Sequence, residues 1–271
     1  MDIKLIAVDL DGTLLRTDKT ISEYTVKILD EFRQAGGIIA IATARSESDC
    51  RQYIDAISPD AVISNRGAMV RIGDDVVCRA VIDIDTTNKI LQSCLGQANI
   101  RYMYTYTDKG YFTNVPQDKH DPHWGEWNPE LYTDFSTNLE HDAYKITLEI
   151  FDDVTAHKIA DSFPSVNMVR FSDGDWYSFA VKHVNKWEGV KALATHLGVD
   201  LKNVAAFGDD YSDIEMLQGC GIGAAVSNAI DEVKAVADYV CLSNDEDGVA
   251  KWLEGHTGHT MDTEVSIGFI S

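Results

Sequence analysis

Aspartates stand directly after two of the apolar runs in this chain. Asp9 and Asp11 follow the run 3–8, and Asp209 follows the run 203–207. Carboxylate oxygens are hard donors, and Mg²⁺ binds one or two carboxylates together with water and phosphate oxygens. A carboxylate can also attack phosphorus, and a second one two residues away could move protons to and from oxygen. These residue types therefore indicate phosphoryl chemistry at a metal site.

Two further polar residues stand where they could hold phosphoryl oxygens. Thr43 follows the apolar run 38–42, and Lys186 opens a predicted helix. A hydroxyl and an ammonium group can stabilise charge on a transferring phosphoryl group. Taken alone, Thr43 is typical of a helix N-cap, Lys186 of a solvated helix, and Asp209 and Asp213 of a helix N-terminus. The combination is more specific, because all of them fall at strand ends of one predicted sheet.

The elements that must position these residues alternate between short apolar runs and helical patterns. The runs 3–8, 38–42 and 61–63 are separated by patterns typical of helices, the first with Ser22 as its expected N-cap and the second over about 46–56. Short runs that are apolar throughout are typical of strands in a parallel sheet, and alternating strands and helices imply right-handed crossovers. Ligands bind at the carboxyl ends of such strands. We therefore predict an α/β fold with a Rossmann-like parallel-sheet core.

The sequence pattern changes over about 83–183 and then returns. Residues 68–82 predict a hairpin, and the following hundred residues hold Tyr- and Thr-rich strand patterns with two helical segments. That composition predicts an inserted, mainly antiparallel α+β domain. Strand and helix patterns of the first kind then resume. We expect a core of residues 1–82 and 184–271, and an inserted cap domain of residues 83–183.

Composition and charge disfavour several classes of partner. The 271 residues carry a net charge of −21, which repels nucleic acid and anionic membrane surfaces, so we expect neither as a partner. The five cysteines show no CxxC spacing, which predicts reduced thiols rather than a cysteine metal site. No apolar run approaches the roughly 20 residues that span a bilayer, and no signal-peptide pattern is present. We expect a cytoplasmic protein.

Four segments together resemble the motifs of the haloacid dehalogenase superfamily. Asp9-Leu10-Asp11-Gly12-Thr13-Leu14-Leu15 resembles the first motif, Thr43-Ala44-Arg45 the second, Lys186 the third, and Gly208-Asp209-Asp210-Tyr211-Ser212-Asp213 the fourth. The insert resembles the C2-type cap of the Cof-like sugar-phosphatase branch. The resemblance extends over roughly residues 1–254. It implies Mg²⁺-dependent hydrolysis of a phosphomonoester through an aspartyl-phosphate, with a sugar phosphate or similar small phosphorylated metabolite as substrate.

The resemblance implies a role for each motif residue. Asp9 is expected to attack phosphorus and, with Asp209, to bind Mg²⁺. Asp11 is expected to be the general acid and base, with its backbone carbonyl reaching the metal ion. The residues expected around them are Thr43 and the backbone of Ala44 at the phosphoryl group, Lys186 as its neutralising cation, Arg45 and Asn228 toward the substrate, and Ser212 and Asp213 behind the metal ligands.

Three positions depart from the family pattern. Ser212 stands where the fourth motif usually has Asn, and serine still offers oxygen to a metal ion or its water. Ala44 replaces the more usual Gly and keeps the backbone N–H. Arg66 precedes Gly67-Ala68 where Asn-Gly-Ala is more usual, so no role is carried over to Asn65 or Arg66.

Polar aromatic residues of the predicted cap would suit a sugar or another small polar ring. Packing within the cap is the simpler interpretation of each one. These residues are Tyr104, Tyr106, His120, His123, Trp124, Trp127 and Asn128.

Two other functions use the same motifs. A phosphomutase would need clustered cap cations for a second phosphate, and the cap's Arg101, Lys145, Arg170 and Lys182 are scattered in the sequence, which favours hydrolysis. A non-catalytic sensor of phosphorylated ligands would be expected to lose the nucleophile or the acid, and this chain has both aspartates of the first motif.

Overall fold

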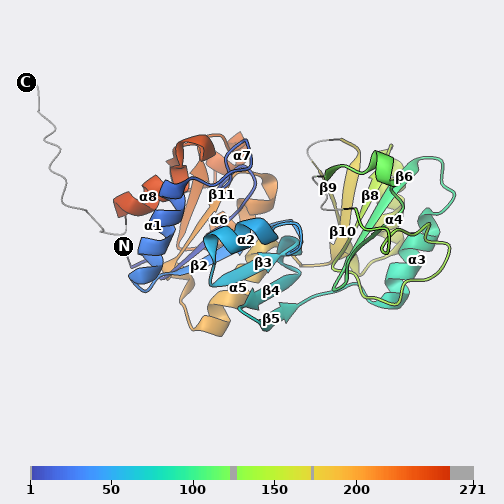
Figure 1. The fold of residues 1–271 in the computed structure, drawn as a ribbon, viewed down its shortest axis with the longest axis horizontal. Helices are drawn as coiled ribbons and strands as arrows, with labels where there is room; N and C mark the ends of the chain where they lie inside the picture. The colour runs from blue at the N-terminus through green and yellow to red at the C-terminus, as the bar shows by residue number, and fades with distance from the viewer. Residues whose placement is uncertain (1, 123–126, 172–173, 257–271) are drawn as a thin grey trace, which may run out of the picture. The chain divides into compact units, whose positions relative to one another are not determined.

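The computed structural model describes residues 2–122, 127–171 and 174–256 (Figure 1). His123, Trp124 and the stretch 257–271 lie outside the described residues. The chain divides into two compact units, residues 1–40 with 198–271 and residues 41–197, and each is described by itself.

The strands and helices follow the alternation expected from the sequence. The strands are β1 (Leu5–Val8), β2 (Ile38–Ala42), β3 (Ala61–Ser64), β4 (Met69–Ile72), β5 (Asp75–Arg79), β6 (Ile100–Thr107), β7 (Gly110–Thr113), β8 (Lys145–Ile150), β9 (Val166–Arg170), β10 (Trp176–Val181), β11 (Val204–Gly208), β12 (Ile222–Val226) and β13 (Tyr239–Cys241). The α-helices are α1 (Glu23–Gln34), α2 (Arg51–Ile57), α3 (Ile84–Cys94), α4 (Asp153–Ser162), α5 (Lys186–Leu197), α6 (Ile214–Gly219), α7 (Asp231–Lys234) and α8 (Gly248–His256). The larger sheet has the strand order β13-β12-β11-β1-β2-β3-β4-β5, and the smaller one β7-β6-β8-β10-β9.

Parallel strands form the centre of the first unit. β1 pairs in parallel with β11, β11 with β12, and β12 with β13. Every residue of β1 and β11 is buried. Strands buried on both faces must be apolar throughout, because neither face meets water. The predicted α/β fold with a parallel-sheet core is therefore confirmed.

Helix α1 begins at the N-cap that the sequence predicts. The Ser22 hydroxyl oxygen accepts a hydrogen bond from the Thr25 backbone N–H at 2.9 Å. The apolar face of the helix is buried at Ile28, Leu29 and Phe32. In Figure 1, α1 and α8 lie side by side within this unit.

Helix α2 begins later than the sequence predicts. We expected a helix over about 46–56, but residues 46–49 form a turn in which the Ser46 hydroxyl oxygen accepts from the Asp49 backbone N–H at 3.2 Å. Ser and Asp side chains compete with helical hydrogen bonds in this way, so the helix starts only at Arg51.

The second unit holds an antiparallel arrangement of strands. β3, β4 and β5 pair antiparallel, and the chain turns at residues 73–74, as predicted for the hairpin. In the smaller sheet β6–β7, β6–β8, β8–β10 and β10–β9 are all antiparallel, in agreement with the predicted α+β character of this region. The boundaries of the cap domain at residues 83 and 183 stay a prediction.

The two faces of strand β8 differ in character. Ile146, Leu148 and Ile150 pack into an apolar core with residues of α3 and α4. Successive side chains of a strand point to opposite faces, so the alternate residues, which begin with Lys145, lie on the other face. All six residues of the strand are buried.

The cysteines and the lengths of the helices bear on two expectations from composition. The five cysteines are free thiols, and burial raises the pKa of Cys50 and of Cys94 to about 12. Among the helices of residues 2–256 that the structure describes, none combines the length and the apolar character needed to cross a membrane.

Candidate active site

Three carboxylates of the first unit lie close together at strand ends. Asp9 follows β1, and the parallel register that pairs Val8 with Phe207 brings it beside the residues after β11. One carboxylate oxygen each of Asp9, Asp209 and Asp213 lies within 4.8 Å of the others. Asp9 is 5% exposed and Asp213 is fully buried. Buried like charges at this distance repel one another, so a divalent metal ion fits this all-oxygen cluster.

The loop between Asp9 and Thr13 is shaped around Asp209. The Thr13 hydroxyl donates to Asp209 Oδ1 at 2.6 Å. Gly12 has φ +77°, and a Cβ at that position would lie 2.4 Å from Asp209 Oδ2. Any side chain at Gly12 would therefore collide with the carboxylate and strain the backbone. Thr13 belongs to the first motif, but no spacing or pattern predicted its hydrogen bond to Asp209.

Asp213 fixes the backbone that carries Asp209. Its Oδ2 accepts from the backbone N–H of Asp209 at 3.1 Å and of Asp210 at 3.2 Å. A Cβ at position 208 would lie 2.4 Å from the Asp213 Cβ, so only glycine fits at this position. Ser212 is half-buried in the same 3-10 turn. The roles predicted for Ser212 and Asp213 behind a metal ion stay predictions.

Asp11 forms an ion pair that the sequence did not indicate. Its Oδ1 lies 2.8 Å from Lys19 Nζ, and the two side chains are 38% and 43% exposed. An ion pair this exposed contributes little to stability, because water screens it. Its effect would instead be to restrain the Asp11 carboxylate.

Asn228 bridges two segments of the first unit. Its Nδ2 donates to the Gly12 carbonyl oxygen at 2.7 Å, and its Oδ1 accepts from the Asn244 backbone N–H at 3.0 Å. Asn244 is itself buried, and its Nδ2 donates to the Leu15 carbonyl oxygen at 2.9 Å. Both asparagines therefore hold the carbonyls of the loop after Asp9. The predicted contact of Asn228 with substrate stays a prediction.

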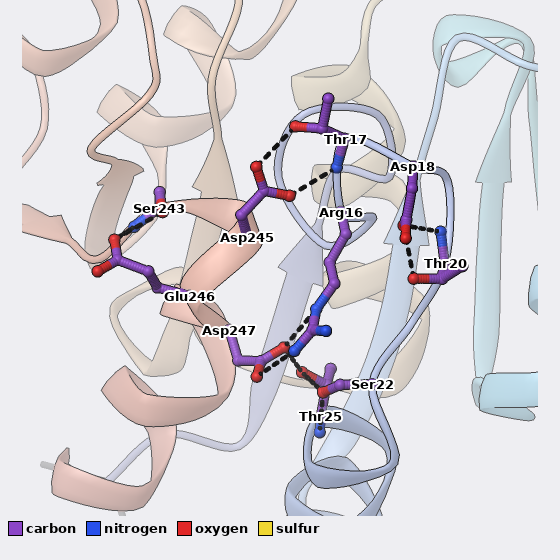
Figure 2. A network of polar contacts seen from close by, with 10 residues as sticks. All are labelled: Arg16, Thr17, Asp18, Thr20, Ser22, Thr25, Ser243, Asp245, Glu246 and Asp247. Carbon is purple, nitrogen blue, oxygen red and sulfur yellow. Dashed lines mark hydrogen bonds and ion pairs between the residues drawn. The ribbon is translucent and has the colours of Figure 1, made fainter.

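A polar network anchors the chain segment that follows this loop (Figure 2). Arg16 Nη2 donates to Asp247 Oδ2 at 2.8 Å, and Thr25 Oγ1 donates to Asp247 Oδ1 at 3.2 Å. Thr17 donates to Asp245 from both its backbone N–H and its hydroxyl, each at 2.8 Å. Partial burial acts to raise the pKa of Asp247, but the hydrogen bond from Arg16 and further hydrogen bonds outweigh it and lower that pKa. The network joins the first unit's two sequence segments.

The residues of the second motif lie in the second unit, directly after β2. Thr43 is 1% exposed, and its Oγ1 accepts from the Arg45 backbone N–H at 3.1 Å. The Arg45 guanidinium lies over the Tyr53 ring at 5.5 Å from its centroid, and its Nη1 donates to the Asp49 carbonyl oxygen at 3.3 Å. Ala44 is exposed.

Each of the three carbonyl oxygens of residues 43–45 accepts a hydrogen bond. The Arg66 backbone N–H donates to the first at 3.0 Å, and the Asn65 backbone N–H donates to the third at 2.8 Å. Lys145 Nζ donates to the second at 2.8 Å. We refer to residues 43–45 as the Thr43 loop.

A strained turn supports both the Thr43 loop and the start of α5. Asn65, Arg66 and Gly67 all have positive φ, at 49°, 62° and 99°. A Cβ at Gly67 would lie 2.1 Å from the Asn185 carbonyl oxygen, so the turn packs against the residue that precedes Lys186. Lys186 is 2% exposed as the first residue of α5. Within the second unit, the turn at residues 65–67 therefore contacts both the Thr43 loop and the residue before Lys186.

Lys145 is a polar residue near these motifs to which no sequence pattern assigned a contact or a role at the site. It is 5% exposed, and its ammonium group lies 4.2 Å from the centroid of the Tyr106 ring. Burial is the main reason that its pKa is lowered to about 8. In the sequence it is one of several scattered cations of the predicted cap. Only the structure shows that its Nζ donates to the Ala44 carbonyl oxygen, 101 positions away.

The aromatic residues of the predicted cap mostly pack against each other. Tyr104, Tyr106 and Tyr111 are buried in one cluster. His120 lies between two of them, with Nδ1 3.3 Å from the Tyr104 hydroxyl and Nε2 3.3 Å from the Tyr111 hydroxyl. The packing interpretation is confirmed for Tyr104 and Tyr106.

The chain is similar to proteins of one family over almost its whole length. A sequence model of the haloacid dehalogenase-like hydrolases matches residues 6–253. The chain is 29% identical over 255 residues to the 5-amino-6-(5-phospho-D-ribitylamino)uracil phosphatase YcsE of Bacillus subtilis, with 93% of this chain and 94% of that protein covered. It is 28% identical over 269 residues to YitU of the same organism, which is named for the same phosphatase activity, with 92% of this chain and 96% of that protein covered.

Solved structures agree with the fold. The crystal structure of TM0651 from Thermotoga maritima matches with a TM-score of 0.81 at 21% identity, over 93% of this chain and 97% of that one. At this level of identity the match bears on the fold alone.

Proposed function

Because the chain belongs to the haloacid dehalogenase-like hydrolases, in the Cof-like group, and is a phosphatase, we propose that it hydrolyses small phosphomonoesters with Asp9 as the nucleophile and Mg²⁺ as the metal ion. The observation that carries the proposal is the cluster of Asp9 with Asp209 and Asp213, in which two segments about 200 positions apart converge so that one carboxylate oxygen of each residue lies within 4.8 Å of the others. Such a cluster of buried carboxylates is costly without a cation.

In the first step, an oxygen of Asp9 attacks phosphorus. The new bond joins the carboxylate oxygen to phosphorus, and the bond from phosphorus to the ester oxygen breaks. Asp11 gives a proton to the departing alcohol. Thr43, the backbone N–H of Ala44 and Lys186 hold and neutralise the phosphoryl oxygens in this proposal, and Arg45 and Asn228 meet the substrate.

In the second step, Asp11 takes a proton from water. The water oxygen bonds to phosphorus, the bond between phosphorus and Asp9 breaks, and inorganic phosphate leaves with Asp9 regenerated. The ion pair of Asp11 with Lys19 restrains the carboxylate that must serve in both steps.

Asp9, Asp209 and the backbone carbonyl of Asp11 would hold Mg²⁺, and Asp213 and Ser212 would support them. When bound, the ion would neutralise charge on the carboxylates and on the phosphoryl oxygens. The hydrogen bonds from Thr13 to Asp209 and from two backbone N–H groups to Asp213 support this assignment, because they orient both carboxylates before any ligand binds.

The proposed substrates are sugar phosphates or similar phosphorylated metabolites. The names of the two Bacillus relatives specify a phosphorylated ribitylamino compound, which is a small polar phosphomonoester. Residues 83–183 would act as a cap that opens for substrate and excludes water during the first step.

The test begins with hydrolysis of p-nitrophenyl phosphate with Mg²⁺ and with EDTA. We expect activity only with the metal ion, and a loss of at least about a thousandfold in Asp9→Asn. Asp30→Asn, an exposed change on α1, is the matched control and should keep full activity. Activity that survives EDTA or Asp9→Asn would overturn the mechanism. Borohydride trapping during turnover should convert Asp9 to homoserine, which peptide mass spectrometry detects.

Isotope-labelled water separates hydrolysis from the phosphomutase alternative. In H₂¹⁸O, hydrolysis places one labelled oxygen in the released phosphate. Transfer to a sugar hydroxyl would instead give an unlabelled sugar phosphate. A panel of phosphorylated metabolites, assayed by phosphate release, then identifies the substrate.

A further inference from the structure

The Thr43 loop is held from two directions. Its first and third carbonyls accept from the backbone of the strained turn at Asn65 and Arg66. Its middle carbonyl, that of Ala44, accepts from the side chain of Lys145 on β8. Two of the three bonds are therefore local to the larger sheet, and the third comes from the smaller sheet.

The Lys145 hydrogen bond continues through a peptide group to Thr43. The carbonyl of Ala44 and the N–H of Arg45 belong to the same peptide. Lys145 Nζ donates to that carbonyl at 2.8 Å, and that N–H donates to Thr43 Oγ1 at 3.1 Å. A charged donor at one end of such a chain polarises the peptide and strengthens the bond at the other end.

The hydroxyl of Thr43 is left with one hydrogen to donate. Its oxygen accepts from the Arg45 N–H, and the residue is 1% exposed. Within the described part of the chain, no acceptor takes the hydroxyl hydrogen of Thr43. A buried donor without a partner is costly unless a ligand supplies the acceptor. The accepted bond from Arg45 restricts the directions in which this hydrogen can point.

The burial of the charged Lys145 side chain is energetically unfavourable. No carboxylate among residues 2–122, 127–171 and 174–256 lies within ion-pair distance of its ammonium group, which contacts the Ala44 carbonyl and the Tyr106 ring. Burying a charge without an ion-pair partner is unfavourable. The Tyr106 contact offsets part of that cost.

The charges around Lys145 do not remove that cost. Asp49 attracts the ammonium group, whereas the guanidinium groups of Arg45 and Arg66 oppose it. The Cys50 thiol also faces the group, but burial raises its pKa to about 12, so it is neutral at ordinary pH.

We propose that Lys145 is a positioning residue for the phosphoryl-binding hydroxyl of Thr43, acting through the Ala44–Arg45 peptide. The proposal rests on the proposed function, in which Thr43 holds an oxygen of the transferring phosphoryl group. Lys145 touches neither substrate nor metal ion in this account. It keeps the peptide oriented so that the Thr43 hydroxyl points its hydrogen at the phosphoryl oxygen.

A double-mutant cycle tests whether the effect passes through Thr43. Lys145→Met removes the donor and keeps the length of the side chain, and Thr43→Val removes the hydroxyl and keeps the branch. We expect Lys145→Met to lower kcat/KM for p-nitrophenyl phosphate about tenfold, which corresponds to about 1.4 kcal/mol. In the Thr43→Val background the same change should lower it less than about threefold, because the hydroxyl it positions is gone.

Additive effects would overturn the relay. If Lys145→Met costs as much with Val at position 43 as with Thr, then Lys145 acts directly on substrate or through another group. An unchanged kcat/KM in Lys145→Met would overturn it too. If the wild type hydrolyses no phosphomonoester, or Asp9→Asn keeps its activity, the proposed function itself has failed, and this outcome is recognised before the cycle is interpreted.

Three comparisons separate positioning from a loss of folding. Lys145→Met should unfold at or above the wild-type temperature, because a buried methionine needs no hydrogen-bond partner. Inorganic phosphate should inhibit this variant more weakly than the wild type, in proportion to the loss of kcat/KM. Lys145→Arg keeps a charged donor and should recover part of the activity. Lys182→Met removes an exposed lysine from the same unit and should behave as wild type.

The pH profile supplies a further readout. Because the pKa of Lys145 is about 8, the ratio of wild-type to Lys145→Met kcat/KM should fall as pH rises from 7 to 9.5. A neutral amine is a weaker donor than an ammonium group. The ratio of Lys145→Arg to Lys145→Met should stay constant over the same range, because the guanidinium stays charged. A wild-type ratio that does not change with pH would contradict the role of the charge.

Discussion

Lys145→Met should make the stability of this protein depend differently on pH. The pKa of Lys145 is about 8 in the folded state, against an ordinary value of 10.5. Between these two values the unfolded chain binds more protons than the folded one. The free energy of unfolding of the wild type therefore rises with pH across this window, and it gains nothing from Lys145 below pH 8, where both states are protonated.

The size of the effect follows from the two pKa values. Each pKa unit corresponds to about 1.36 kcal/mol, so the full difference amounts to about 3 kcal/mol. Between pH 7 and pH 10 the linkage relation gives about 2 to 3 kcal/mol, roughly half of it by pH 9. Methionine does not titrate, so the free energy of unfolding of Lys145→Met lacks this rise with pH. Its stability advantage over the wild type should shrink by that amount as pH rises.

Urea unfolding followed by circular dichroism measures the difference. Both proteins are unfolded at pH 7, 8, 9 and 10, and the free energies are subtracted at each pH, so the titration of every other group cancels. With an m-value of about 2.5 kcal/mol/M, the two midpoints should move relative to each other by about 1 M. Lys182→Met, at an exposed position, should show no such movement. A difference that stays within about 0.5 kcal/mol from pH 7 to pH 10 would refute the burial argument.

Other predictions concern single positions of the first unit. Gly12→Ala should lower Mg²⁺ affinity, measured by calorimetry, by at least about tenfold, because its Cβ meets Asp209 at 2.4 Å; Gly36→Ala, with positive φ and nothing within 4 Å, should not. Asp209→Asn should weaken Mg²⁺ binding by a similar factor while the urea midpoint stays near wild type. Asp213→Ala should lower the free energy of unfolding by about 2 kcal/mol, because two backbone N–H groups lose their acceptor, and an unchanged urea midpoint would contradict this. Ser22→Ala should lower it by about 1 kcal/mol through loss of the α1 N-cap, whereas Ser22→Thr should keep most of it.

Local patterns determined most of the elements. The apolar runs at 3–8, 38–42 and 203–207 predicted strands that the structure places at Leu5–Val8, Ile38–Ala42 and Val204–Gly208. Such runs are informative because a strand covered on both faces tolerates few polar residues. The N-cap of α1 was predictable for a similar reason, since its hydrogen bond spans three residues.

Prediction failed where local and long-range preferences compete. Residues 46–50 carry a helix-like pattern, but the Ser46 and Asp49 side chains bond to nearby backbone and delay α2 to Arg51. Similarly, the hydrogen bonds of Asn228 to Gly12 and to Asn244 join residues that no sequence pattern relates.

The order of residues was enough to predict that acidic and hydroxyl side chains stand at the ends of buried strands, because strand ends are visible in the apolar pattern. The convergence of Asp9 with Asp209 followed from this, since parallel pairing of β1 and β11 brings their carboxyl ends together. The burial of Lys145 and its hydrogen bond to the Thr43 loop, in contrast, became visible only in the folded chain. That contact joins residues 101 positions apart on two different sheets. Burial and hydrogen-bond geometry at such a distance depend on how the elements pack, which the order of residues along the chain does not specify.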